Sequence, residues 1–189
     1  MRDIESFVNI IDVESTCWEP KESKPEDQIS EIIEIGISVV NTNSLQIVKT
    51  SSIIIKPEKS KISDFCTKLT TLTTDIVDAG IPFQKAVEIL KRDYKSHKTT
   101  FISWGDYDRK MFEKNCKNYN VDYPFGPRHI NLKNCFSLFN GFTKEFGLDY
   151  ALNYYNLILE GTHHRGEWDA HNTAKIFIKM LKTFRKLED

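Results

Sequence analysis

The stretch "VNIIDVESTCW", Val8 to Trp18, decides the fold that we expect for this chain. Its first residues are mostly apolar, and the run then ends in two carboxylates, Asp12 and Glu14, with one residue between them. On an extended strand, residues two apart point to the same side, so both carboxylates would face one point. Two anions held close together repel each other unless a cation lies between them or one takes a proton.

The pair alone leaves two interpretations open. Carboxylate oxygens that face one point suit a hard ion such as Mg²⁺ or Mn²⁺. The alternative is a strand end that frays into solvent, where both carboxylates are hydrated. The choice depends on whether the rest of the chain supplies partners for Asp12 and Glu14.

The composition is typical of a globular protein. The chain has 189 residues, of which 40% are hydrophobic and 28% charged, and this suits one domain with a full core. The net charge of -1 disfavours a protein that coats duplex nucleic acid. It does not exclude a nucleic-acid enzyme, because metal ions supply positive charge that the sequence count omits.

The sequence also predicts where the protein is located. No apolar stretch is long enough to cross a bilayer, and "MRDIESFVNII" lacks the features of a signal peptide, so we expect a cytoplasmic protein without a membrane partner. The four cysteines form no C-x-x-C pair, and no histidine lies at zinc-finger spacing from them. We therefore expect reduced thiols and no structural zinc.

The first third of the chain predicts an antiparallel meander of three strands. The polar residues Asn41–Ser44 supply one turn, and Trp18–Gln28, with two prolines and many charges, predicts a solvated loop. The three β-rich segments are Ser6–Asp12, Ile29–Asn41 and Leu45–Pro57.

The remainder alternates between predicted strands and helices. The strands are Thr99–Asp106 and Arg128–Lys133. The helices are Ile81–Ser96, Tyr107–Tyr119, Asn134–Gly147 (closed by Gly147), Leu148–Leu157 and Glu167–Leu187. This order predicts a single α/β domain over residues 1–189, with a mixed sheet of about five strands flanked by helices.

A second pair of carboxylates follows the predicted strand Thr99–Asp106. Asp106 and Asp108 open the next helix. An acidic residue in a first helical turn caps free N–H groups and complements the helix dipole, which explains one of the two. We assign Asp106 as the cap and Asp108 as a ligand.

The third acidic position lies near the start of the last predicted helix. Asp169 is near the inward face of that helix, and a buried aspartate is costly unless it is paired or metal-bound. His164 precedes it by five positions, in a loop between Gly161 and Gly166. A loop histidine can accept a proton from water at neutral pH. Taken singly, however, His164 is an ordinary loop histidine.

The combination of these residues is more specific than its parts. Four carboxylates at three chain positions predict a site for two Mg²⁺ or Mn²⁺ ions about 4 Å apart. One ion lowers the pKa of a water, and His164 removes its proton. The hydroxide then attacks phosphorus in line, and the second ion stabilises the leaving oxygen. This is phosphodiester hydrolysis in which the protein mainly positions the reactants.

Three segments resemble the exonuclease motifs of the DEDDh superfamily of 3′→5′ exonucleases. They are "FVNIIDVESTCWE", "SWGDYDRKMFEKNC" and "GTHHRGEWDAHNTAKI". "EIIEIGISVV", "FCTKLTTLTTDIV" and "INLKNCF" are also similar to the Eri and KapD-like branch, which includes histone-mRNA 3′-end exonucleases.

The resemblance implies an RNase H-like fold with a central five-stranded sheet, and Asp12, Glu14, Asp108 and Asp169 as metal ligands. It also implies His164 as general base, although His163 stands directly before it; the spacing to Asp169 favours His164. The implied reaction takes nucleoside 5′-monophosphates from the 3′ end of single-stranded nucleic acid. RNA is the preferred substrate, because the branch resemblance points that way.

A strand end must also be gripped by its last nucleotides. Base–aromatic stacking contributes about 1–3 kcal/mol per base, and Trp18, Phe65 and Trp104 are the aromatic candidates. Leu69 and Thr70 match the segment that contacts the terminal base in this family, while Ser15 and Thr16 offer groups to the terminal sugar. The alternative for Phe65 and Leu69, which are four apart, is a core position on one helical face.

Several points stay open at this level. Arg165 is one of several basic residues that either meet phosphates or are ordinary surface charges, and Glu34 in "IIEIGI" is either an acceptor behind the site or a strand-edge charge. The rival functions are a DNA-directed proofreading or repair exonuclease, a catalytically silent nucleic-acid-binding regulator and a nucleotide phosphatase.

Overall fold

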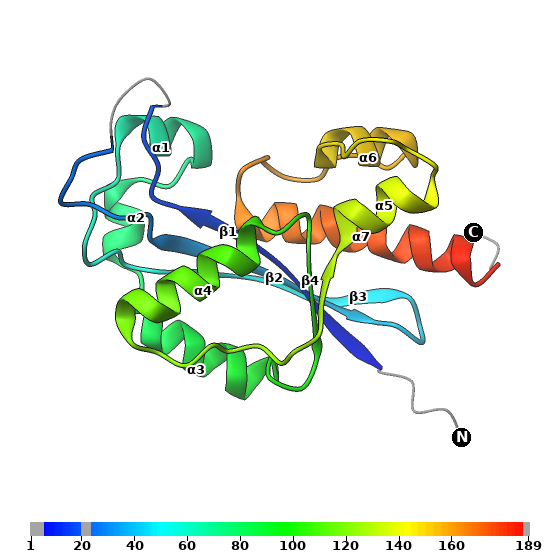
Figure 1. Cartoon of the computed structure of the whole chain (residues 1–189), viewed down its shortest axis with the longest axis horizontal. Coiled ribbons are helices and arrows are strands. Elements are labelled where there is room, and N and C mark those ends of the chain that lie inside the picture. Colours follow the sequence, from blue (N-terminus) through cyan, green and yellow to red (C-terminus); the bar gives the residue numbers. More distant parts are fainter. Residues whose placement is uncertain (1–5, 20–23, 187–189) are drawn as a thin grey trace.

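The computed structural model describes residues 6–19 and 24–186 and contains one five-stranded sheet (Figure 1). The strand order is β3-β2-β1-β4-β5. β1 pairs antiparallel with β2, β2 pairs antiparallel with β3, and β4 and β5 continue the sheet as parallel strands. The strands are β1 (Phe7–Ser15), β2 (Ile32–Asn41), β3 (Gln46–Ile54), β4 (Thr100–Ser103) and β5 (His129–Asn131). The predicted mixed α/β sheet is confirmed.

Seven helices accompany this sheet in the described part of the chain. They are α1 (Asp64–Thr70), α2 (Thr74–Asp78), α3 (Phe83–Asp93), α4 (Tyr107–Tyr119), α5 (Leu132–Phe139), α6 (Leu148–Tyr154) and α7 (Gly166–Phe184). Within the same residues, none of these helices has the length and apolar character needed to cross a membrane. Residues 20–23 of the predicted loop Trp18–Gln28 lie outside the described residues.

One predicted helix needs correction, and two short helices are additional. The helix predicted over Asn134–Gly147 ends early: α5 begins at Leu132 and ends at Phe139, and Gly141 follows with a positive φ of 70°. Gly147 closes no helix, because it is the N-cap of α6. The short helices α1 and α2 were not predicted; each begins at a hydroxyl cap, Ser63 or Thr73, that accepts a backbone N–H.

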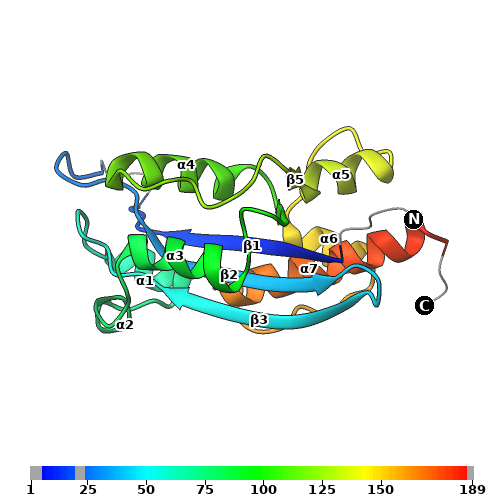
Figure 2. The same ribbon diagram turned by 90° about the horizontal axis from the view of Figure 1, so that it is seen from below.

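Helices cover both faces of the sheet (Figures 1 and 2). Alternate residues of β1 divide between the two cores, since Ile11 and Val13 pack with α3 and α4, whereas Val8 and Ile10 pack with α5, α6 and α7. Asp12 and Glu14 continue the second series. The alternation of β1 therefore turns both carboxylates toward the face that α7 covers.

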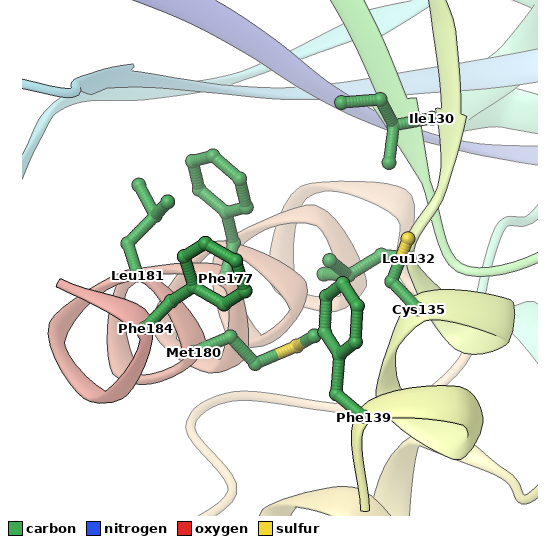
Figure 3. A pocket seen from close by; sticks show the side chains of 8 residues that line it. All are labelled: Ile130, Leu132, Cys135, Phe139, Phe177, Met180, Leu181 and Phe184. Atoms are coloured by element: carbon green, nitrogen blue, oxygen red, sulfur yellow. The ribbon is translucent and has the colours of Figure 1, made fainter.

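An apolar pocket lies between α5 and the C-terminal half of α7 (Figure 3). Its volume is about 250 Å³. It is lined by Ile130, Leu132, Cys135, Phe139, Phe177, Met180, Leu181 and Phe184. On an α-helix, Asp169 lies about 12 Å or more along the axis from the pocket residues of α7, so the pocket is separate from the acidic end of the helix.

Candidate active site

Carboxylates from two distant segments meet on the α7 face of the sheet. Asp12 and Glu14 lie on β1, and Asp169 lies in the first turn of α7. Each of the three offers an oxygen, and these oxygens all lie within 4.8 Å of one another. Glu14 and Asp169 are only 8% and 4% exposed. The structure thus brings together three of the four carboxylates predicted as ligands.

Asp108 approaches the same strand from α4. Its Oδ1 accepts the backbone N–H of Val13 at 2.9 Å, between Asp12 and Glu14 in the chain. β1 pairs with β4 only over Val8–Ile10, so the strand beyond that point has no β4 partner and Asp108 occupies the position instead. Asp108 is 3% exposed but lies outside the 4.8 Å group of the other three carboxylates.

The electrostatics of this cluster are unfavourable without a cation. Burial, and then the charge of Asp108, raise the pKa of Asp12 well above its ordinary value. Burial and Asp169 raise the pKa of Glu14 to about 8. Burial raises the pKa of Asp108 to about 7, although the N–H of Val13 acts in the opposite direction. No described residue donates a hydrogen bond to the carboxylate of Asp12 or of Glu14. A set of ligands made only of oxygen atoms suits a hard divalent ion.

Asp106 has a different environment. It occupies the N-cap position of α4, as predicted, yet its side chain makes no capping hydrogen bond. The carboxylate instead lies 3.6 Å from the Arg109 guanidinium, and it is 41% exposed. The prediction of its position holds, whereas the predicted capping hydrogen bond is absent.

Two neighbouring histidines face Asp169. The Nδ1 atom of His163 lies 2.9 Å from Oδ1 of Asp169, and the backbone N–H of His164 donates to Oδ2 at 2.9 Å. The two rings are 4.0 Å apart between centroids. His164 has a φ of 60°, in the left-handed region that a residue with a side chain rarely adopts. Burial and the charge of His163 lower the pKa of His164.

Two glycines allow α7 to reach the sheet beside Asp12. Gly36 is the partner of Asp12 in the β1–β2 register. A Cβ atom on Gly36 would lie 1.8 Å from the carbonyl oxygen of Gly166, the first residue of α7. Because Gly36 has no side chain, the first turn of α7 can lie directly on β2. This turn carries Asp169 to the cluster.

Glu34 is the residue whose role the sequence did not reveal. It lies on β2, an interior strand of the sheet, so the strand-edge interpretation is wrong. The side chain is fully buried and forms an ion pair with Arg165, with Nε of Arg165 3.0 Å from Oε2. Arg165 is thereby held by a protein carboxylate, which leaves it a poor candidate for a phosphate contact.

Ser15 and Thr16, the two residues after Glu14, are both buried but differ in their hydrogen-bond partners. The Ser15 hydroxyl lies 2.6 Å from the phenolic oxygen of Tyr107, the residue before Asp108. The Thr16 hydroxyl donates to the carbonyl of Ile29 and accepts the N–H of Glu31, and the Thr16 N–H donates to the carbonyl of Glu31. Thr16 is 1% exposed and its hydroxyl and N–H are engaged within the protein, which argues against the predicted contact with the terminal sugar.

The residues predicted to contact the terminal base differ in exposure. Phe65 is half-buried and Leu69 is 36% exposed on α1, and neither belongs to a core cluster of the described residues, so the alternative core assignment fails. Thr70 is fully buried, and its hydroxyl donates to the carbonyl of Cys66. Trp18 is half-buried near the end of β1.

Trp104 is half-buried and packs against the core on the α7 face. Its ring lies 5.8 Å from that of Phe136 between centroids, in the core on the α7 face. Its Nε1 atom is buried and has no hydrogen-bond partner among the described residues. This packing argues against Trp104 as an exposed stacking platform. The burial of the Thr70 side chain likewise argues against a contact between Thr70 and the terminal base.

Residues 10–177 match the family described as exonuclease, RNase_T. This chain belongs to the RNase_T exonuclease family. The matched residues include both β1 carboxylates, Asp108, Asp169 and the two histidines.

Individual relatives agree with this assignment. The chain is 31% identical over 169 residues to a probable 3′-5′ exonuclease, KapD, of Bacillus subtilis, and the match covers 89% of this chain and 81% of KapD. It is 30% identical over 186 residues to 3′-5′ exoribonuclease 1 of Rattus norvegicus, covering 93% of this chain but only 53% of that protein. The chain thus spans about half the length of this exoribonuclease.

A solved structure extends the comparison to the fold. The nuclease domain of 3′hExo, a DEDDh family member bound to rAMP, superposes with a TM-score of 0.84 at 28% identity, and the match covers 100% of this chain and 98% of that chain. The predicted RNase H-like fold and DEDDh membership of this RNase_T exonuclease are confirmed.

Proposed function

We propose that this protein is a metal-dependent 3′→5′ exonuclease. It hydrolyses the last phosphodiester bond at the 3′ end of single-stranded nucleic acid and releases a nucleoside 5′-monophosphate. One observation carries the proposal: the oxygens of Asp12, Glu14 and Asp169 lie within 4.8 Å of one another, and the described chain supplies no donor to the first two. Residues 1–189 form one exonuclease domain, and its location is the cytoplasm, which suits the four free cysteines.

The carboxylates are the proposed ligands of two Mg²⁺ or Mn²⁺ ions. Buried carboxylates that repel one another fit hard divalent cations, and Asp12 and Glu14 receive no hydrogen bond from the described residues. Asp108 lies against the same strand through its bond to the Val13 N–H. Such ions, when bound, activate a water and stabilise the charge that develops on the phosphate. The ligand set is Asp12, Glu14, Asp108 and Asp169.

His164 is the proposed general base. Its lowered pKa keeps the imidazole neutral at neutral pH, so a ring nitrogen is free to accept the proton of the attacking water. Asp169 fixes the histidine backbone through the His164 N–H, while His163 places a second ring against the first. His163 contacts Asp169 through its side chain, and we assign it an orienting role.

In this proposal the strand end lies beside the C-terminal end of β1 and against α1. Ser15 and its partner Tyr107 offer hydroxyl groups next to two of the ligands. Trp18, Phe65 and Leu69 offer partly exposed apolar surfaces for the terminal bases. Because stacking tolerates any base, we expect little base preference.

RNA is the proposed substrate, supported by the relative named exoribonuclease and by the rAMP-bound nuclease domain. Matched 5′-labelled RNA and DNA oligomers, incubated with the protein and Mn²⁺, test this choice. We expect stepwise shortening from the 3′ end, faster on RNA, with loss of activity in EDTA. Faster shortening of DNA would favour a DNA-directed exonuclease, and binding without shortening would indicate a silent regulator.

A further inference from the structure

Glu34 is a buried carboxylate that the hydrolytic mechanism does not use. It faces Glu14 across the β1–β2 register and is 0% exposed. Four donors reach it: Nε and Nη2 of Arg165 at 3.0 and 3.2 Å, the N–H of Gly166 at 3.0 Å, and the hydroxyl of Ser52 at 2.6 Å. Three of these four donors belong to Arg165 and Gly166, the two residues that immediately follow His164 in the chain.

The loop that carries His164 is therefore held from two sides. On one side, Asp169 binds the backbone N–H of His164. On the other side, Glu34 binds the Arg165 side chain through a two-pronged ion pair and also binds the Gly166 N–H. A planar guanidinium that meets a carboxylate through two nitrogens fixes direction as well as distance.

The backbone of His164 requires such support. Its φ of 60° lies in a region that costs about 1 kcal/mol or more for a residue with a side chain. A residue keeps such a conformation only where its surroundings hold it. Arg165 and Gly166 are fixed on β2 and so hold the chain directly after this turn, and a ring nitrogen of His164 lies within 4.8 Å of an Asp169 oxygen.

We propose that the Glu34–Arg165 ion pair is a positioning device for His164. The proposal rests on the proposed function, because it concerns the proton acceptor of that reaction. The pair sets the direction of the histidine relative to the carboxylates and takes no part in holding the ions or the strand end. Its loss slows the chemical step and leaves cation affinity unchanged.

A purely structural role is the competing explanation, and Glu31 offers a matched control. Glu31 is also buried, 1% exposed, and accepts the N–H groups of Glu58 and Lys59 at 2.9 Å. It also accepts the phenol of Tyr119, and no residue of the histidine loop contacts its side chain. Glu31→Gln and Glu34→Gln therefore remove the same charge from two buried sites. Only the Glu34 site contacts the residues that follow His164.

The decisive measurement is a double-mutant cycle with His164→Ala. We expect Glu34→Gln to lower kcat on a single-stranded oligomer by about 10–100-fold, with KM and calorimetric Mn²⁺ affinity within about twofold. In the His164→Ala background, Glu34→Gln should change kcat by less than about twofold. Equal losses in both backgrounds, or an equal loss in Glu31→Gln, would overturn the proposal. If Glu34→Gln does not fold, Arg165→Lys, which keeps the charge but loses the fork, takes its place in the cycle.

Hydrogen exchange tests the pair without any nuclease activity. We expect amide exchange of residues 163–166 to become at least about tenfold faster in Glu34→Gln and to stay unchanged in Glu31→Gln. Unchanged exchange in Glu34→Gln would refute the positioning role even if the wild-type protein shortened no oligomer. An inactive wild type with accelerated exchange would refute the proposed function and retain the positioning pair.

Discussion

Glu14 and Glu34 are neighbours on adjacent strands and point to the same face of the sheet, yet their surroundings are opposite. Four protein donors surround the carboxylate of Glu34, including the Arg165 guanidinium. Glu14 receives none from the described residues and lies beside other carboxylates, which helps to raise its pKa to about 8. Both side chains are buried, so burial alone does not separate them.

The difference shows how this fold distributes its charges. An isolated buried carboxylate is costly, and the protein compensates that cost at Glu34 with its own donors. At Glu14 and Asp12 no protein donor offsets the free energy of burying a charged carboxylate. A cation from solution would offset it. We therefore propose that Glu34 is a structural anchor of the histidine loop and that Glu14 is a ligand.

The largest expected effect separates the two glutamates by cation binding. Glu14→Gln keeps the side-chain volume and removes a ligand charge, so we expect kcat on single-stranded RNA to fall by about 10³-fold or more, with at least about tenfold weaker Mn²⁺ binding. Glu34→Gln should leave Mn²⁺ binding within about twofold, as measured by calorimetry. Equal weakening in both variants would abolish the distinction between anchor and ligand.

A second test applies the same contrast to the two aspartates at the start of α4. Asp108→Asn retains an oxygen for the Val13 N–H but removes the charge near Asp12, and we expect kcat to fall by about 10²-fold. Asp106→Asn affects an exposed partner of Arg109 and should change kcat by less than about threefold. Steady-state kinetics on one RNA oligomer compares the two, and similar losses would overturn the assignment of Asp108 as ligand.

A third test moves α7 away from β2. It should disturb the acidic cluster around Glu14 and the donors of Glu34 together. In Gly36→Ala the new methyl meets the backbone of Gly166, so α7 must shift and carry Asp169 and Arg165 with it. We expect a kcat loss of about 10–100-fold and a lower melting temperature by about 3–10 °C. Gly147→Ala is the control, because a Cβ there meets nothing within 4 Å. A fully active Gly36→Ala would show that the close approach is not needed.

The sequence predicted the acidic centre because each proposed ligand ends or opens an element with strong periodicity. Asp12 and Glu14 end a buried strand, and Asp108 and Asp169 open helices α4 and α7, so local pattern and strand alternation suffice. The donors of Glu34 could not be predicted in the same way. Arg165 is 131 positions away, and no local pattern specifies a pairing across that distance.

The substrate contacts were less predictable for a related reason. Thr16 and Thr70 looked available in the sequence, but their hydroxyls bond to carbonyls of the protein itself. Short polar side chains satisfy neighbouring backbone groups as readily as they meet a ligand, and the choice depends on how the loops fold. α1 and α2, of seven and five residues, are also too short for helical periodicity to appear.

The smallest expected effect concerns stability, where the two glutamates should act with opposite sign. The pKa of Glu14 is raised from 4.5 to about 8 in the folded, metal-free protein, so folding binds a proton that the unfolded chain releases. Stability should therefore fall as the pH rises from about 4.5 to about 8, and Mn²⁺ should restore it.

Glu14→Gln removes this penalty, and at pH 8 without metal we expect its melting temperature to rise by about 3–6 °C. Glu34→Gln breaks a buried ion pair and should lower the melting temperature at the same pH. Scanning calorimetry of both variants in EDTA, at pH 5 and pH 8, measures the two changes. A lower melting temperature for Glu14→Gln at pH 8 would mean that the protein itself stabilises this carboxylate, and the contrast between the two glutamates would fail.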